Sequence, residues 1–266
     1  MLNHMIEATI AYAARMPLRQ RYYANDHARD TVVIEPHGMP LSDARAAPAS
    51  LDAEGFQLVR HASRVTDFED PAEVAAIYSG EIVELLLGLT GADAVFVTAP
   101  GILRFAESSG RAGSRNNSMP ARFAHVDVST ETSAAFAARG LPEGKAMRRY
   151  AQFNLWRSIG GVPQDVPLAV ADARSVAAED LMIADAVFDE PGRPEWSFDS
   201  YLVAHNPAHR WCWYPDMTRD EVLVFRTGDS RDPRPVPHVA FDNPLAPLDC
   251  PPRVSIEMRA AAYWYA

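Results

Sequence analysis

Cysteine is scarce in this sequence, and long apolar runs are missing. The 266 residues include only Cys212 and Cys250, which excludes a disulfide framework and any zinc site built from cysteine pairs. No apolar stretch approaches the roughly 20 residues of a membrane span. The N-terminal segment carries Glu7 and lacks the basic start and apolar core of an export signal. We therefore expect a cytoplasmic protein that does not associate with a membrane.

Positive charge is also in deficit, with 25 Lys and Arg against 35 Asp and Glu and a formal net charge of -10. Such a field repels polyanions, so nucleic acid is not an expected partner. A glycine-rich turn between a strand and a helix, which a nucleotide-type methyltransferase fold needs, is absent as well. The stretch GLTGAD at 88–93 follows a helix and precedes a strand, which is the wrong order.

Length and composition favour one domain. A chain of 266 residues with 48% hydrophobic content can bury a sizeable core. No linker or internal repeat divides it, so we expect a single domain over 1–266, with 1–60 as an N-terminal extension of loops and strands. The sequence leaves the oligomeric state open, with a homodimer as one option.

The pattern changes along the chain. Residues 70–92 begin at Asp70-Pro71, carry apolar residues at helical spacing and end at glycines, which predicts a helix. A strand is expected at 94–100. The glycine- and arginine-rich segment 104–120 reads as a mobile loop or lid, and a short helix is expected from Thr130.

From Arg148 onward the sequence breaks into short β-prone pieces divided by turns. The eight pieces are RRYAQFNLWRSI, PLAVADARSV, LMIADAVF, SYLVAHN, RWCWYP, EVLVFRT, PHVAF and RVSIEMRAAAYWY. Without βαβ alternation, they predict a mainly β protein with flanking helices, folded as an antiparallel jelly roll. Trp211 and Trp213 share a strand face and are expected in the core.

The stretch HVD at 125–127 is a candidate metal site. Residues i and i+2 of a strand point to one side, so His125 and Asp127 can offer an imidazole and a carboxylate to one ion. A chain of this composition contains about one His-x-acid pair by chance, so the pair alone carries no weight. A facial triad needs a second histidine from a distant strand. His238 is favoured over its rivals His205 and His209.

The last strand alternates sharply. Arg253, Ser255, Glu257 and Arg259 fall on one face, and apolar residues fall on the other. If the apolar face packs on the fold, the polar face lines the barrel interior, where a ligand or partner must satisfy it. A guanidinium beside a hydroxyl suits a carboxylate, so Arg253 with Ser255 is the favoured anchor. Arg259 is the rival, with Glu257 as its expected partner.

A second polar row is expected on the strand around FNLWR at 153–157. Tyr150, Asn154 and Arg157 are interpreted as one interior row that touches cosubstrate or substrate, or else forms a structural network. Tyr150 is the member assigned to the cosubstrate. Trp156 and Arg122 are further candidates for substrate binding or for support of the site.

The loop 104–120 adds three arginines. Arg104, Arg111 and Arg115 can meet a substrate carboxylate, although a solvated loop is the simpler interpretation.

HVD, a distal histidine in PHVAFDNP and then RVS together resemble the iron(II)/2-oxoglutarate-dependent oxygenases. More closely, NLWRSIGGVPQDVPLAVADARSV and NPAHRWCWYPDMTRDEVLVF are similar to the CmcJ/AsaB group, which includes cephamycin 7α-hydroxylation proteins and a fungal gibberellin desaturase. The resemblance covers residues 55–262.

This resemblance implies a double-stranded β-helix, the cupin-like form of the jelly roll. It implies iron(II) on His125, Asp127 and His238, and 2-oxoglutarate anchored by Arg253 and Ser255. With O2 as second cosubstrate, it implies hydroxylation or desaturation of an unactivated C–H bond in a small specialised-metabolite or amino-acid-derived substrate.

Three other functions stay open at this point. A cupin-like metal enzyme that does not use 2-oxoglutarate would keep the metal ligands and leave Arg253 structural. A methyltransferase would need the missing glycine-rich turn. A non-catalytic binding barrel would tolerate a degenerate triad, whereas His125, Asp127 and His238 form an intact one.

Overall fold

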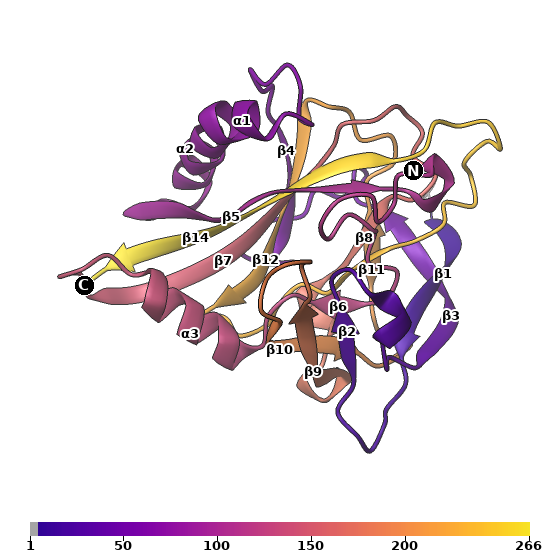
Figure 1. The fold of residues 1–266 in the computed structure, drawn as a ribbon, viewed down its shortest axis with the longest axis horizontal. Helices are drawn as coiled ribbons and strands as arrows, with labels where there is room; N and C mark the ends of the chain where they lie inside the picture. Colours follow the sequence, from indigo (N-terminus) through magenta and orange to yellow (C-terminus); the bar gives the residue numbers. More distant parts are fainter. Residues whose placement is uncertain (1–4) are drawn as a thin grey trace.

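Two β-sheets face each other in the computed structural model, which describes residues 5–266 (Figure 1). The larger sheet, in spatial order, consists of β1 (Met5–Ala13), β3 (Ile34–Asp43), β11 (Trp211–Trp213), β8 (Leu168–Ala171), β13 (His238–Ala240), β6 (His125–Val126), β10 (Trp196–Val203), β9 (Leu181–Phe188) and β2 (Arg21–Tyr23). The smaller sheet consists of β4 (Phe56–Arg60), β12 (Glu221–Asp229), β7 (Met147–Ser158), β14 (Val254–Tyr265) and β5 (Ala94–Phe105).

The mainly β jelly roll is confirmed, and each of the eight pieces expected after Arg148 contains a strand. The pairing differs in one respect from a purely antiparallel roll. β3 pairs with β11, and β2 pairs with β9, in parallel. Both exceptions involve strands of the first sixty residues, which therefore extend the larger sheet at two separate places. Short-range sequence patterns do not encode such long-range pairing.

The helix expected over 70–92 is present in three consecutive parts. They are α1 (Pro71–Glu73), a π-helical turn η2 (Val74–Tyr78) and α2 (Ser79–Thr90). The Asp70 side chain accepts a hydrogen bond from the backbone N–H of Ala72, and Gly91 ends the helix at φ 62°. Ile82 and Leu86 pack against the smaller sheet and cover its outer face. Single-turn 3-10 helices occur at η1 (His27–Arg29), η3 (Glu107–Ser109), η4 (Ala173–Ser175) and η5 (Ala178–Asp180).

The alternation expected in the last strand is confirmed. Ile256, Met258 and Ala260 of β14 are buried in the same apolar cluster as α2. The polar face of β14 consequently points to the space between the sheets. This strand lies between β7 and β5 and runs across the length of the molecule (Figure 1).

A third helix, α3 (Thr130–Gly140), starts directly after the HVD segment and is capped by the Ser129 side chain, which accepts from the N–H of Thr132. It packs against β12 where the register of β12 on β7 shifts between Arg226 and Gly228. A Cβ at Gly228 would lie 2.1 Å from the Ser133 hydroxyl oxygen. Only glycine lets the helix approach this closely.

Among residues 5–266, no helix combines the length and apolarity that crossing a bilayer requires.

We expect Gly228→Ala to lower the free energy of unfolding by about 1–3 kcal/mol, because the added methyl group overpacks the contact with α3. Gly88→Ala is the matched control. A Cβ at Gly88, on the exposed side of α2, meets nothing within 4 Å, so this change should raise stability by up to about 1 kcal/mol through helix propensity. Urea unfolding followed by circular dichroism measures both; equal effects would contradict the close approach.

Candidate metal centre

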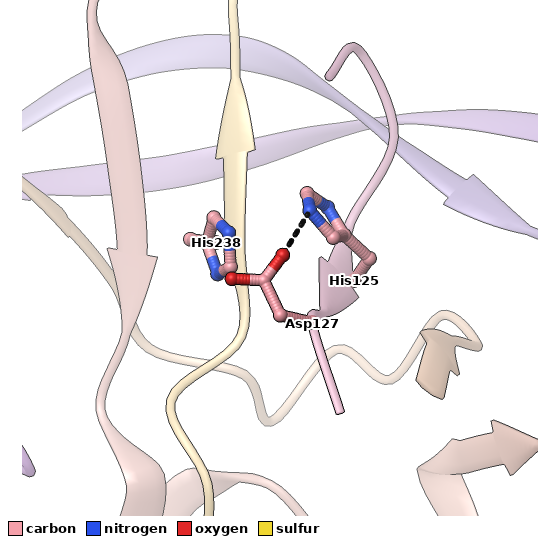
Figure 2. Close-up of side chains that lie close together, drawn as sticks. All are labelled: His125, Asp127 and His238. Atoms are coloured by element: carbon pink, nitrogen blue, oxygen red, sulfur yellow. Dashed lines mark ion pairs between the residues drawn. The ribbon is translucent and has the colours of Figure 1, made fainter. Parts of the chain in front are cut away.

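His125, Asp127 and His238 come together in the space between the sheets (Figure 2). One potential ligand atom from each lies within 4.8 Å of the others, and all three residues are buried. Backbone pairing places them: β13 pairs with β6 at His238 opposite His125, and Asp127 follows β6 on the same side as His125. The imidazole centroids are 4.2 Å apart. The structure therefore joins the two histidines that the sequence separates by more than a hundred residues.

Each imidazole has a nitrogen available to a metal. The carbonyl oxygen of Phe123 lies 2.9 Å from His125 Nδ1 and accepts its hydrogen bond, while Nε2 faces Asp127, 3.6 Å from Oδ1. His238 Nδ1 is buried and has no hydrogen-bond partner among residues 5–266. Burial, with His125 nearby, lowers the pKa of His238 to about 3. Both rings can thus present the neutral form that binds metals.

The carboxylate of Asp127 is held from two sides. Burial alone would raise its pKa, but Arg259 and the two histidines hold the pKa of Asp127 well below its usual range. Arg259 Nη2 donates to Oδ1 at 3.1 Å, and the Asn154 side-chain amide donates to Oδ2. The group is therefore ionised and fixed in orientation.

These residues fit a divalent metal. Two neutral imidazoles and one carboxylate are the donor set of the facial triad typical of non-haem iron(II). The distance of 3.6 Å between His125 and Asp127 is too long for a hydrogen bond, yet leaves room for an ion between them.

Arg253 is a buried cation without a carboxylate partner among residues 5–266. Its Nε donates to the Ser255 hydroxyl at 3.0 Å and Nη1 donates to the Val166 carbonyl at 2.9 Å. The guanidinium also lies over the ring of Trp156, 5.2 Å from its centroid. Burial, together with Arg104 and Arg122, lowers the pKa of Arg253 to about 9. An added carboxylate would compensate this charge.

Arg259, the rival anchor, already has partners. Besides Asp127, it binds Glu257, with 3.0 Å between Nε and Oε1, as the sequence predicts. These two carboxylates, with Arg259 itself largely buried, raise the pKa of the guanidinium above its ordinary value. Because Arg259 already binds Asp127, it is better placed to orient this metal ligand than to bind a further anion.

The row expected on β7 is only partly correct. Asn154 donates to Asp127 and Trp156 contacts Arg253, so both lie directly beside candidate site residues. Tyr150 is on the same face but lies under α3, in a small apolar cluster with Ala137 and Tyr263, and nothing around it supports a cosubstrate role.

The placement of Arg157 on this row is wrong. An odd spacing from Asn154 turns Arg157 to the other face of the strand. There it donates to the Tyr78 hydroxyl at 3.0 Å and to the carbonyl of His61 at 3.0 Å, outside the barrel interior.

The segment 104–120, expected as a loop, begins with the last two residues of β5 and is anchored at several points. Arg111 Nη1 and Arg115 Nη2 bind the carboxylate of Glu69 at 3.0 and 3.2 Å. Glu69 therefore neutralises both arginines, although Arg115 also lines the larger of the two cavities described below. Arg122, just after this loop, forms ion pairs with Asp242 and with Glu107, and its Nη1 is buried without a partner in the described part of the chain.

The rival histidines are elsewhere. His209 is buried between Asp180 and Tyr12, 3.1 Å from an oxygen of each, and His205 stacks on His37 with ring centroids 3.6 Å apart. Neither approaches the cluster of His125, Asp127 and His238.

Two cavities meet at this cluster. The smaller, which we call the metal-facing pocket, has a volume of about 220 Å³ and is lined by His125, Asp127 and Arg259. The larger cavity, about 1180 Å³, shares Asp127 and Arg259 and extends along apolar residues of β5 toward α3. Both have Phe188 and Phe198 in their walls. The sequence contains no signal for these aromatic pocket walls. Phe188, Phe198 and Tyr22 belong to β9, β10 and β2, and only long-range strand pairing brings them to the metal-facing pocket.

Comparisons with known proteins agree with this geometry. A family model described as "Oxidoreductase/YMDC permease-like domain" matches residues 10–263. The chain is 30% identical to "Hydroxylase/desaturase efuI" of Hormonema carpetanum, covering 81% of this chain and 79% of the relative. It is also 30% identical to "Fe(II)/2-oxoglutarate-dependent dioxygenase nvfI" of Aspergillus novofumigatus, covering 86% and 84%.

The fold has a solved counterpart. The structure titled "iron and alpha-ketoglutarate-dependent endoperoxidase NvfI with different conformation" superposes with a TM-score of 0.84 over 100% of both chains, at 22% identity. At this identity the likeness shows the fold.

The pair between Arg259 and Asp127 should be among the most important for stability. Arg259→Met leaves two buried carboxylates without a cation, and we expect a loss of about 3–5 kcal/mol in the free energy of unfolding of the metal-free protein. Arg193→Met is the control, because its pair with Glu190 is 73% exposed on the arginine side and should change stability by about 0–1 kcal/mol. Urea unfolding measures the stability of both variants. A small loss of stability in Arg259→Met would argue against a stabilising role for the pair between Arg259 and Asp127.

Proposed function

Because the chain belongs to the family of hydroxylase/desaturases and Fe(II)/2-oxoglutarate-dependent dioxygenases, we propose that it binds iron(II) through His125, Asp127 and His238 and takes 2-oxoglutarate at Arg253 and Ser255. The membership confirms the resemblance seen in the sequence. The chain is accordingly an oxidoreductase, and neither the cupin-like alternative without 2-oxoglutarate nor the methyltransferase is favoured. The buried His-Asp-His cluster carries the metal assignment.

Iron(II) with 2-oxoglutarate and O2 supplies the oxidising power to remove hydrogen from an unactivated C–H bond. The residues of the chain bind and orient. Arg259 and Asn154 fix both oxygens of Asp127, and Phe123 fixes the ring of His125 through its carbonyl. Preorganised ligands of this kind bind the metal without rearrangement.

Arg253 provides the charge that a dicarboxylate needs at its far end. Ser255 and Val166 hold the guanidinium in place, and Trp156 covers one face of it. A planar guanidinium in a site sheltered from water binds a carboxylate strongly and in one orientation. This is the support for choosing Arg253 over Arg259, whose charge already serves Asp127 and Glu257.

The substrate of such an enzyme is a small molecule, and we propose that the larger cavity receives it. Its volume of about 1180 Å³ accommodates a molecule of several rings. The name of the relative supports hydroxylation or desaturation as the reaction, and we propose a specialised metabolite as the substrate. We also propose a cytoplasmic location, which the two unpaired cysteines support.

The metal assignment is tested by anaerobic titration of the metal-free protein with iron(II) and 2-oxoglutarate. We expect a weak visible charge-transfer band that saturates at one iron per chain in the wild type. His238→Ala removes one of three ligands and should abolish the band and lower iron affinity at least 10-fold, the lower bound for disturbing a metal site. The control His205→Ala changes the rival histidine and should leave the titration unaltered.

Retention of the band in His238→Ala, with its loss in His205→Ala, would reject the assignment. Iron binding without the band in the wild type would instead support the cupin-like alternative.

The cosubstrate assignment has a separate test. Arg253→Gln removes the charge and keeps a polar side chain, and we expect 2-oxoglutarate binding to weaken by about 2–5 kcal/mol, the usual range for truncating one partner of a buried charge pair. Iron(II) binding in the absence of 2-oxoglutarate should stay unchanged, because Arg253 does not touch the ligands. Unaltered 2-oxoglutarate affinity would show that another cation holds the dicarboxylate.

A further inference from the structure

Arg104 lies beside the proposed cosubstrate anchor, although no motif marks it. It is on β5, directly opposite Ser255 of β14 in the antiparallel ladder. Cross-strand partners point to the same face of a sheet. The Arg104 side chain therefore enters the space between the sheets together with Arg253 and Ser255, and it lines the metal-facing pocket.

One edge of the Arg104 guanidinium is fixed by the loop that follows β5. Nη1 lies 2.9 Å from the carbonyl oxygen of Asn117, 2.8 Å from its side-chain oxygen and 2.7 Å from the carbonyl oxygen of Met119. Asn117 adopts φ 53°, a left-handed conformation that is uncommon outside glycine. The loop thus holds the arginine in one orientation and leaves Nη2 and Nε without a hydrogen bond in the described part of the chain.

No carboxylate within residues 5–266 forms an ion pair with Arg104, and the nearby ones have other partners. Asp127 and Glu257 are bound by Arg259. Asp30, also on the pocket wall, accepts from the backbone N–H of Tyr23 at 2.7 Å and lies against His27. Burial lowers the pKa of Arg104 from its ordinary value, and Glu257 offsets this only in part. Arg111 and Arg115 of the same loop, by contrast, share Glu69.

Aromatic rings form much of the remaining wall of the metal-facing pocket: Tyr22, Tyr23, Phe123, Phe188 and Phe198. Three arginines line this pocket: Arg259 and Arg122 pair with carboxylates of the chain, whereas Arg104 does not. Pockets that combine apolar walls with an unpaired charge select ligands that carry the opposite charge on an apolar body.

We propose that Arg104 binds a carboxylate in the metal-facing pocket. The carboxylate belongs either to an aromatic or otherwise apolar acid that is the substrate, or to the far end of 2-oxoglutarate, and the aromatic walls favour the substrate. This inference rests on the proposed function, since it assigns the pocket beside the iron ligands to an acid.

The test compares Arg104→Gln with the wild type and with Arg111→Gln. Arg111 belongs to the loop that follows β5, but it pairs with Glu69 and lines neither cavity. Two ligands are titrated into each protein. Benzoate and its neutral analogue benzamide, followed by calorimetry on the metal-free protein, probe the charge. 2-Oxoglutarate with iron(II), followed anaerobically through the charge-transfer band, probes the cosubstrate. Circular dichroism verifies that each variant folds. Arg104→Lys tests whether a positive charge without the guanidinium geometry is enough to bind the carboxylate.

We expect the wild type and Arg111→Gln to bind benzoate more tightly than they bind benzamide. Arg104→Gln should lose at least about tenfold in benzoate affinity, as for a lost charge-assisted hydrogen bond, while its benzamide affinity stays unchanged. Unaltered 2-oxoglutarate affinity in Arg104→Gln then identifies the substrate as the source of the carboxylate. A tenfold loss for 2-oxoglutarate instead identifies the cosubstrate.

If benzoate and 2-oxoglutarate bind Arg104→Gln as they bind the wild type, or if benzoate does not bind the wild type and 2-oxoglutarate is unaffected, the inference is overturned. Failure of the wild type to bind iron(II) would contradict the metal assignment instead, and would leave the benzoate comparison to decide on Arg104.

Discussion

The ion pair between Asp127 and Arg259 connects the two sheets at the point where the chemistry is proposed. Asp127 follows β6 of the larger sheet and Arg259 is on β14 of the smaller one, and Asn154 of β7 supplies a second bond across the same gap. Buried charges are tolerated only when they are paired and hydrogen-bonded. The separation of the sheets and the orientation of the metal-binding carboxylate are therefore set by the same contacts, and any shift between the sheets disturbs both.

Much of the fold and the centre of the site could be predicted from sequence. The strands after Arg148 and the helix from Pro71 have strong local periodicity, and the two faces of β14 follow directly from alternation. His125 and Asp127 share a side because strand geometry requires it. No strand alternation links His238 to His125, since their pairing joins segments far apart in the chain, and the family resemblance adds the main support for His238 over His205 and His209.

What the sequence could not supply has physical reasons. Parallel pairing of β2 with β9 and of β3 with β11 depends on the whole sheet and leaves no local pattern. Tyr150 follows the expected alternation, yet α3 covers that end of the strand, and helix packing is not visible in strand periodicity. The position of Arg157, by contrast, is readable from the sequence, because an odd spacing from Asn154 places it on the other face of the strand. Arg111 and Arg115 pair with a glutamate that only the fold brings near.

The arginines around the site divide by whether the protein itself neutralises them. Arg259, Arg111 and Arg115 have carboxylate partners within the chain, and they hold a metal ligand or a loop in place. Arg253 and Arg104 have hydrogen bonds to neutral oxygens but no carboxylate in the described part of the chain. Keeping a cation buried without an anion costs stability in the empty protein, and this cost is offset when an anionic ligand binds. Two such cations flanking Ser255 on one face therefore indicate that this end of the barrel is built to receive carboxylates.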